Sequence, residues 1–132
     1  MKYKNMCLFC TPQNFRSRLI KTFEHSYWVL AENQFYQGYS LLLSKQHFIE
    51  WHDVPEEIAL SLHQNLREIA RLIQSTFQPH KINLASLGNV TPHLHWHIIP
   101  RYLSDPHHMQ PPDFTMPASL TAEMLTFFKS KV

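Results

Sequence analysis

Glycine is scarce in this chain of 132 residues, in which only Gly38 and Gly88 occur. With so few, each glycine is expected to serve the backbone conformation rather than fill a surface. Long hydrophobic runs are also missing: no stretch approaches the roughly 18 consecutive apolar residues of a membrane span. The chain has no repeat or low-complexity segment. With 44% hydrophobic and 17% charged residues, it is expected to form one domain with its own core.

A large excess of either charge is absent as well. The formal net charge is +2 and no cluster of Lys or Arg stands out, which argues against a nucleic-acid surface. The first ten residues, MKYKNMCLFC, contain neither the apolar segment nor the small-residue cleavage site of a signal peptide. We therefore expect a cytoplasmic protein that contacts neither membranes nor nucleic acids.

Hydrophobic patterns predict strands before and after a single long helix. Strands are expected over residues 18–23, 26–31, 39–44, 81–87 and 93–102, and a short helix over 119–129. The long helix carries one apolar stripe at spacings of three and four residues: Ile58, Leu62, Leu66, Ile69, Ile73 and Phe77. Asp53 with Glu56 resembles a capping box, and Gln78-Pro79 is expected to end the helix. This order predicts an α+β fold with a mostly antiparallel sheet.

Histidine, by contrast, is frequent, at 10 residues. Three of them lie in the stretch PHLHWHIIP, residues 92–100. Successive strand residues point to opposite faces of a sheet, so this stretch would separate its histidines from its apolar residues: His93, His95 and His97 against Leu94, Trp96 and Ile98. The apolar face is expected to pack on the core, and the histidine face to carry chemistry.

The pattern alone leaves three interpretations open. A merely polar surface is the least favoured, because three imidazoles that titrate together are a costly way to be polar. Imidazole suits zinc, but His93 and His97 would lie about 13 Å apart along a strand, so one ion can hardly bind all three. Alternatively, a neutral imidazole whose far nitrogen is held by an acceptor can attack phosphorus and form a covalent phosphoramidate.

The segment HLHWHII (residues 93–99) matches the pattern His-φ-His-φ-His-φ-φ, where φ is an apolar residue. Asn83 and Gly88-Asn89 precede it, and GYSLLLSKQH (residues 38–47) is similar to the motif Gly-His-x-φ-φ-φ-Pro-Lys-x-His. In this order the segments resemble the histidine triad (HIT) superfamily of nucleotide hydrolases and transferases. The resemblance covers about residues 7–101. It implies a single HIT-like domain over 1–132, with a Pro-rich segment and a short helix over 102–132.

The resemblance implies an enzyme that cleaves a purine nucleotide derivative at its α-phosphorus, of the dinucleoside polyphosphate or nucleoside phosphoramidate type. His95 would be the nucleophile that takes the nucleotidyl group, and His97 would contact the scissile phosphate and help the leaving group. Asn89, next to the substrate-binding Gly88, would donate to the phosphate. Members of the superfamily are usually homodimers, and the chemistry itself needs no metal.

Two further polar residues are expected to bind substrate. Asn83 resembles a polar position that lines the same pocket, and Glu32 falls near the family's ribose-binding residue. Each polar candidate also has a purely structural interpretation. Asn83 can satisfy local backbone, Asn89 can be a turn residue after Gly88, and Glu32 can be a surface loop residue.

Two positions depart from the superfamily's motif. Tyr39 stands where a histidine is common, and Ser44 stands where proline is usual. The replaced histidine normally supports the catalytic group from a neighbouring strand. This departure keeps a non-catalytic nucleotide-binding regulatory protein open as an alternative, and a metal-dependent hydrolase that uses triad histidines is another.

Cysteine is as scarce as glycine, with Cys7 and Cys10 in the stretch CLFC. In a cytoplasmic chain this spacing indicates a metal or redox pair rather than a structural disulfide, but two ligands do not close a tetrahedral zinc site. Some HIT proteins complete such a site with two histidines, and the matching positions here are His47 and His93. The resemblance thus implies a structural Zn²⁺ that ties the N-terminus to the sheet, with free thiols as the alternative.

Overall fold

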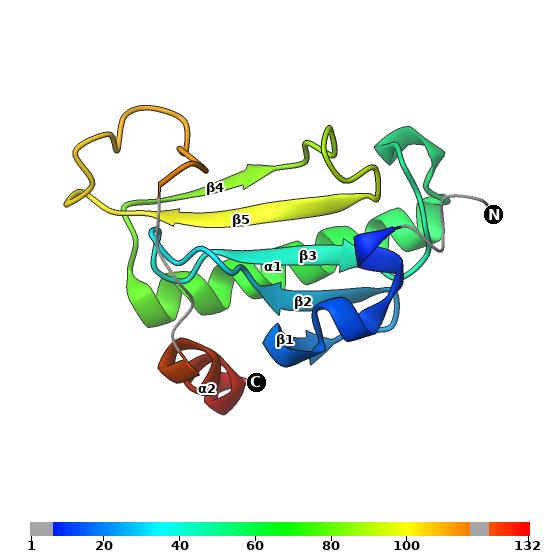
Figure 1. Cartoon of the computed structure of the whole chain (residues 1–132), viewed down its shortest axis with the longest axis horizontal. Coiled ribbons are helices and arrows are strands. Elements are labelled where there is room, and N and C mark those ends of the chain that lie inside the picture. The colour runs from blue at the N-terminus through cyan, green and yellow to red at the C-terminus, as the bar shows by residue number, and fades with distance from the viewer. Residues whose placement is uncertain (1–6, 117–121) are drawn as a thin grey trace.

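The centre of the fold is an antiparallel sheet, seen in Figure 1 in a computed structural model that describes residues 7–116 and 122–132. Its strands lie in the order β1-β2-β3-β5-β4. They are β1 (Leu19–Thr22), β2 (Ser26–Leu30), β3 (Ser40–Ser44), β4 (Lys81–Ala85) and β5 (His95–Arg101). Every neighbouring pair is antiparallel. The expected α+β fold is confirmed, and β5 is paired on both of its sides.

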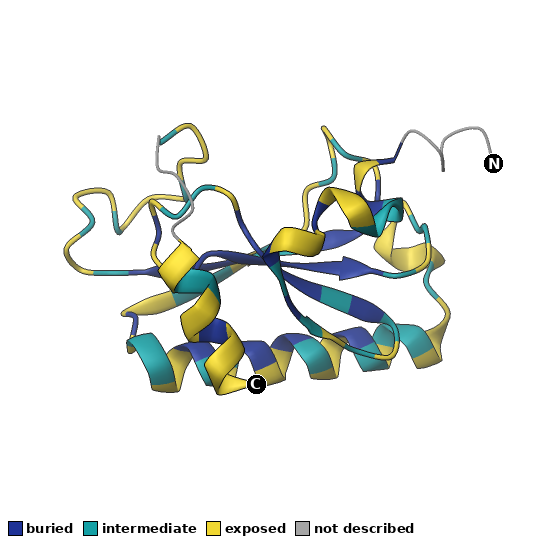
Figure 2. Ribbon diagram, turned by 60° about the horizontal axis from the view of Figure 1, so that its bottom comes forward, coloured by how far each residue is buried: buried dark blue, intermediate teal, exposed yellow. Residues whose placement is uncertain are grey.

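One face of the sheet is covered by the long helix α1 (Glu56–Phe77), whose buried residues face the strands in Figure 2. The predicted stripe is confirmed, because Leu62, Leu66, Ile69 and Ile73 are all buried. The last three share a core cluster with side chains of the sheet, among them Trp28, Leu42 and Ile98. Burial of one such aliphatic side chain contributes about 1.5–3 kcal/mol, so this stripe holds α1 on the sheet.

The predicted capping box of α1 is wrong. The helix begins after Pro55, which forms no side-chain cap hydrogen bond. Asp53 lies earlier, in the short 3₁₀ turn η5 (Trp51–Asp53). Acidic residues in the first turn instead favour the helix start by meeting the positive end of its dipole. The helix end is as predicted, since Gln78 follows in the left-handed conformation at φ 50°.

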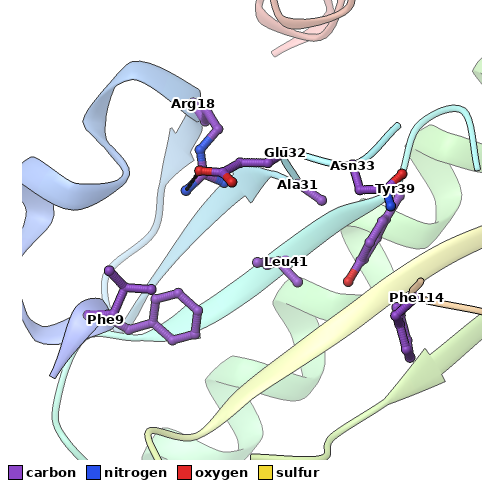
Figure 3. Close-up of a pocket in the computed structure, with 9 residues that line it drawn as sticks. Phe9, Arg18, Ala31, Glu32, Asn33, Tyr39, Leu41 and Phe114 are labelled. Carbon is purple, nitrogen blue, oxygen red and sulfur yellow. Dashed lines mark ion pairs between the residues drawn. The ribbon is translucent and has the colours of Figure 1, made fainter. Parts of the chain in front are cut away.

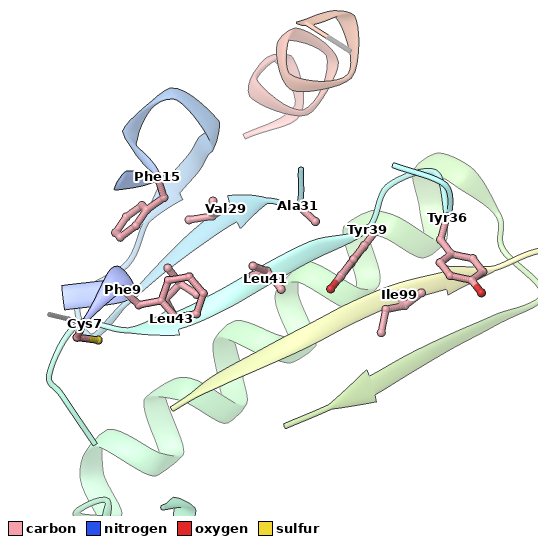
Figure 4. Packing of buried hydrophobic residues seen from close by; sticks show 10 residues of the cluster. All are labelled: Cys7, Phe9, Phe15, Val29, Ala31, Tyr36, Tyr39, Leu41, Leu43 and Ile99. Carbon is pink, nitrogen blue, oxygen red and sulfur yellow. The ribbon is translucent and has the colours of Figure 1, made fainter. Parts of the chain in front are cut away.

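The opposite face of the sheet carries the histidines, and the N-terminal segment covers part of it. Three short 3₁₀ helices form this segment: η2 (Leu8–Cys10), η3 (Pro12–Asn14) and η4 (Arg16–Arg18). Figure 4 shows side chains of the N-terminal segment and of the strands in one buried cluster, which includes Cys7, Phe9, Phe15, Val29, Leu41, Leu43 and Ile99. The histidine face is therefore enclosed on one side rather than fully open to solvent.

Strand β5 begins at His95, two residues later than predicted. His93 lies in the preceding loop, where its backbone N–H donates to the Thr91 carbonyl at 2.8 Å. The predicted alternation holds within the strand. Trp96 is opposite Leu42 on the helix side, whereas His95 and His97 are opposite Leu43 and Leu41 on the other side.

Strand β4 ends at Ala85 rather than at residue 87. The Ser86 hydroxyl donates to the carbonyl of His95 at 2.9 Å, so a side chain satisfies this carbonyl at the end of the ladder. The chain then leaves the sheet and forms a loop over residues 86–94. This early departure creates the loop that borders the candidate site.

Both glycines serve the backbone, as expected. Gly88 has a φ of 72° within the loop, and Gly38 has a φ of 91° just before β3. A side chain is disfavoured at such angles. A Cβ at Gly38 would also lie 3.2 Å from the ring of Phe77, at the C-terminal end of α1.

After β5 the chain makes a series of turns over residues 102–116, and the helix α2 (Ala122–Lys131) closes the fold. Phe128 of α2 packs on Trp28 with ring centroids 5.4 Å apart. The helix extends two residues past the predicted end at 129, and its predicted start at 119 lies outside the described residues. No helix within 7–116 or 122–132 is long and apolar enough to cross a bilayer.

Candidate functional site

His95 is a buried imidazole, 5% exposed, whose two ring nitrogens have different surroundings. Its Nδ1 donates to the carbonyl oxygen of His93 at 2.6 Å. In a neutral ring this leaves Nε2 without a hydrogen, as a nucleophile requires. The ring of Phe9 packs edge-on against His95 with centroids 4.9 Å apart, which restrains the orientation of the imidazole.

A cavity of about 310 Å³ lies beside His95, and we name it the triad cavity. Its lining consists of His95, His97, Leu41, Phe9, Phe114 and the loop residues 87–91. The fold thus brings Gly88 and Asn89 to the same cavity as the two histidines. Groups that can attack, protonate and bind a phosphate therefore surround one space.

His97 is supported from the neighbouring strand by Tyr39. The Oη of Tyr39 lies 2.6 Å from Nδ1 of His97. Burial raises the pKa of Tyr39, so the phenol stays protonated and can donate to Nδ1. That bond leaves the hydrogen of the neutral imidazole on Nε2. Tyr39, at the position where the motif commonly has histidine, thus keeps a hydrogen-bond partner for the triad.

The environment keeps both imidazoles neutral near pH 7. Burial lowers the pKa of His95, opposed in part by the hydrogen bond to the His93 carbonyl. Burial, and then repulsion from His95, lowers the pKa of His97 to about 4. The two rings lie 5.0 Å apart between centroids, so two charges there would repel. The site therefore presents one acceptor and one donor nitrogen.

A second cavity of about 250 Å³, which we name the side cavity, shares Phe9, Leu41 and Phe114 with the triad cavity. Figure 3 shows its lining, with the charged pair Arg18 and Glu32 at one wall. The Glu32 carboxylate lies 3.7 Å from the Arg18 guanidinium, and the Glu32 side chain is 81% exposed. The predicted residue Glu32 thus lines the adjoining cavity and does not line the one with the histidines.

Asn83 lies elsewhere than expected. Its Oδ1 accepts a hydrogen bond from Arg101 at 3.0 Å, and it lines a separate cavity of about 520 Å³. Strand register explains the correction. Asn83 is opposite Ile99, whereas Ala85 is opposite His97. Asn83 therefore lies two residues before the position on β4 that faces His97, and further from His95. The expectation that Asn83 lines the pocket of His95 is therefore wrong.

Four thiol and imidazole groups converge next to the triad cavity, and we name them the metal corner: Cys7, Cys10, His47 and His93. Their Sγ and Nδ1 atoms all lie within 4.8 Å of one another. The separation is 3.1 Å for Cys10 and His47, 3.3 Å for Cys7 and His93, and 3.2 Å for the two imidazoles. Ligand atoms around tetrahedral zinc lie roughly 3.3–3.8 Å apart. These four residues, as expected from the sequence, can bind a metal ion.

The second nitrogen of His93 fits this role. Nε2 donates to the Ser44 carbonyl at 2.7 Å, so Nδ1 carries no hydrogen and faces the thiols. The Ser44 side chain also contributes, since its Oγ lies 3.3 Å from the same Nε2. Phe9, between the two cysteines, packs edge-on against both His93 and His95. The metal corner and the triad cavity therefore share one aromatic wall.

The sequence profile of the HIT domain matches residues 13–104, more than half of the chain. The chain belongs to the HIT family. A curated relative, the protein hit of Bacillus subtilis, is 29% identical over 103 residues, which are 73% of this chain and 71% of the relative.

Solved HIT structures share the fold. A histidine triad protein from Bradyrhizobium japonicum matches with a TM-score of 0.78 and 25% identity, over 86% of this chain and 85% of that one. A Zn-bound histidine triad family protein from Mycobacterium smegmatis matches with a TM-score of 0.73 and 21% identity, over 97% and 94% of the two chains. Their likeness extends over nearly the whole chain, beyond the segments that carry the sequence motifs.

Sequence reasoning missed two aromatic residues of this HIT site. Phe9 had one signal, its place between the paired cysteines. Phe114 had none, because it lies among prolines in a segment without periodicity. Only the folded chain brings the Phe114 ring to His97, with centroids 5.1 Å apart.

Proposed function

We propose that this HIT protein is a hydrolase or nucleotidyl transferase that acts on purine nucleotide derivatives through a nucleotidyl-His95 intermediate. The observation that carries the proposal is that the hydrogen bonds of two neighbouring imidazoles favour different tautomers. Nδ1 of His95 is bonded to a backbone carbonyl at 2.6 Å, and Nδ1 of His97 is bonded to the Tyr39 phenol at 2.6 Å. One Nε2 can therefore attack, while the other can donate.

In the first step, the lone pair of His95 Nε2 forms a bond to the α-phosphorus. The bond between phosphorus and the leaving atom breaks, and the leaving atom keeps that electron pair. It takes one proton from the pair formed by His97 and Tyr39, through His97 Nε2. The leaving atom is thereby expelled in protonated form, as part of an alcohol, an amine or a phosphate, instead of as a strongly basic anion.

In the second step, water attacks the phosphorus and the bond to His95 Nε2 breaks. The proton lost by the water returns to the pair of His97 and Tyr39, so the enzyme ends as it began. The products are a nucleoside monophosphate and the protonated leaving group. An alcohol or another nucleophile in place of water would give nucleotidyl transfer.

The phosphate and the nucleoside are assigned to the two adjoining cavities. The Asn89 side-chain amide, next to Gly88, would donate to the phosphate oxygens as charge develops. The side cavity supports binding of the nucleoside, because its aromatic and aliphatic walls suit a purine base and the Glu32 carboxylate suits ribose hydroxyls. Cavities of this kind, apolar with a few polar groups, are typical of small-molecule sites.

The metal corner is proposed to hold a structural Zn²⁺. Two thiolates and two imidazoles are a ligand set that zinc prefers, and the Zn-bound relative from M. smegmatis supports this identity. When bound, the ion would cross-link the N-terminal segment to the sheet. Only His93 of the triad belongs to the metal corner, so the ion is not needed at the phosphorus.

The quaternary state and the cellular location are extensions of the family resemblance. We infer a cytoplasmic homodimer, without a nucleic-acid or membrane partner. Sedimentation of the purified chain over a range of concentrations tests the dimer. A monomer at micromolar concentration would reject it.

The central experiment is intact-protein mass spectrometry after brief mixing with adenylyl substrates, with wild type beside His95→Asn. Wild type is expected to gain an acid-labile nucleotidyl mass, and the variant none. Nucleotide binding without adduct or turnover would reject the enzyme and favour a regulatory nucleotide-binding protein. Loss of activity on chelation, with the fold retained, would favour a metal-dependent hydrolase instead.

A further inference from the structure

Phe114 occupies the junction of the two cavities. Its ring lies 5.1 Å from the His97 ring and 5.9 Å from the Tyr39 ring, between centroids. It lines both the triad cavity and the side cavity, and Figure 3 shows it beside Tyr39. Because His97 is proposed to donate to the leaving atom, any leaving group must pass next to this ring.

A buried arginine holds the segment that carries Phe114, which we name the strap (residues 102–116). Arg101 is only 1% exposed. Its guanidinium donates to three groups of the strap: the Asp105 carboxylate at 2.8 Å, the His107 carbonyl at 2.9 Å and the Gln110 carbonyl at 2.7 Å. Next to Phe114, the N–H of Asp113 donates to Tyr36 Oη at 2.9 Å. The strap is thus fixed to the sheet although it contains no helix or strand.

On the side of the triad cavity, the wall around Phe114 is mostly apolar and carries no formal charge. None of the described residues that line the triad cavity is Asp, Glu, Lys or Arg. Two apolar residues of its loop, Leu87 and Val90, are 56% and 95% exposed. A hydrocarbon group bound there would cover them and gain from their burial. A polyphosphate chain in the triad cavity, in contrast, would lose water and find no Lys or Arg among the residues that line it.

From these observations we propose that Phe114 is a specificity-determining residue, which selects substrates whose leaving group is uncharged and apolar. The inference rests on the proposed function and narrows it. Among α-phosphorus substrates it favours nucleoside phosphoramidates of hydrocarbon amines over dinucleoside polyphosphates. In the reaction the P–N bond breaks, and the amine leaves with the electron pair and one proton.

Two matched ligands test the proposal: adenosine 5′-phosphorobenzylamidate and its 4-carboxybenzyl analogue, which adds one negative charge to the leaving group. Affinities are measured by calorimetry in His95→Asn, which cannot form the intermediate. The uncharged ligand is expected to bind at least about tenfold more tightly. Adding Phe114→Ala is expected to reduce this ratio to about threefold or less, with Phe114→Leu intermediate.

Phe127→Ala in the same background is the matched control. Phe127 is 39% exposed and Phe114 is 40% exposed, but Phe127 lies on α2 and lines a different cavity. Its replacement is expected to leave the binding ratio unchanged. Equal affinity for the two ligands, or a ratio that Phe114→Ala leaves intact, would overturn the proposal.

The kinetic counterpart is the ratio of kcat/KM for the two ligands in a protein with intact His95. Phe114→Ala is expected to lower this ratio about as much as the binding ratio, which a merely structural role would not do. The binding ratio does not depend on turnover. If the uncharged ligand binds more tightly but no adduct forms on His95, the proposed reaction is rejected and the role of Phe114 in selectivity is retained. If the adduct forms but the two ligands bind equally, the proposed role of Phe114 is rejected and the proposed reaction is retained.

Discussion

His93 and His95 are two positions apart in the chain, yet they present different ring nitrogens. His93 presents Nδ1 to the metal corner, and His95 presents Nε2 to the triad cavity. His93 donates from Nε2 to the Ser44 carbonyl and turns Nδ1 toward the thiols. His95 donates from Nδ1 to the His93 carbonyl and is left with a free Nε2. The role of each imidazole is therefore set by which nitrogen a backbone carbonyl occupies. The type of residue is the same in both places.

Replacing His95 should separate the two regions most sharply. His95→Asn is expected to lower turnover more than about 10³-fold, because it removes the proposed nucleophile. Its metal content should match wild type, since the four residues of the metal corner are unchanged. Steady-state rates and elemental analysis check both parts. Turnover within tenfold of wild type would contradict the assignment.

Replacing a residue of the metal corner should mainly lower the metal content and the stability of the fold. Cys7→Ser is expected to lose the metal and to lower the free energy of unfolding by about 3 kcal/mol or more, since metal binding is coupled to folding. Denaturant unfolding with and without a chelator measures this loss. The exposed His63→Asn on α1 is the control and should behave as wild type. An unchanged unfolding midpoint in Cys7→Ser would show that no metal stabilises the fold.

Tyr39→Phe sharpens the comparison within the triad cavity. Loss of the hydroxyl removes the partner of His97 Nδ1, so kcat is expected to fall about 10- to 100-fold, while KM changes by about twofold or less. Tyr39→His should restore part of the rate, because imidazole can also donate. A full rate in Tyr39→Phe would reduce Tyr39 to a packing residue.

The smallest expected effect concerns pH. Folded His97 titrates at a pKa of about 4 because burial disfavours its charge, whereas the unfolded residue titrates at about 6.5. The unfolded state thus binds more protons as pH falls through this window, and stability declines. Relative to His97→Asn, wild type should lose on the order of 1–2 kcal/mol between pH 6.5 and 4. Urea titrations in the Cys7→Ser background exclude acid release of metal, and parallel pH curves would refute the assignment.

The elements that local pattern specifies were the ones predicted correctly. The stripe from Ile58 to Phe77 identified α1, because a period near 3.6 with six apolar members has no other regular solution. The capping box failed because two acceptable side chains at the right spacing do not specify where the chain turns into the helix. The helix begins directly after Pro55, which lies inside that four-residue stretch.

The site divides in the same way. Histidine alternation assigned His95 and His97 to one face, and motif spacing assigned the four groups of the metal corner, which the fold brings within 4.8 Å. Asn83 was misplaced because its location depends on the register between β4 and β5, which hydrogen bonds across strands decide. His93 lies outside the strand because its backbone N–H bonds to the carbonyl of Thr91 instead of to β3.

The sequence by itself determined the family, the α+β class, the long helix and the identity of the polar groups. Motif spacing identifies the family, and the period of apolar residues shows which face of a helix or strand each residue occupies. Tertiary structure alone decided which nitrogens of His93 and His97 are hydrogen-bonded, which cavity each polar residue lines, and that Phe114 returns to His97 from 17 positions away. These features depend on contacts between segments distant in sequence, and no local period encodes such contacts.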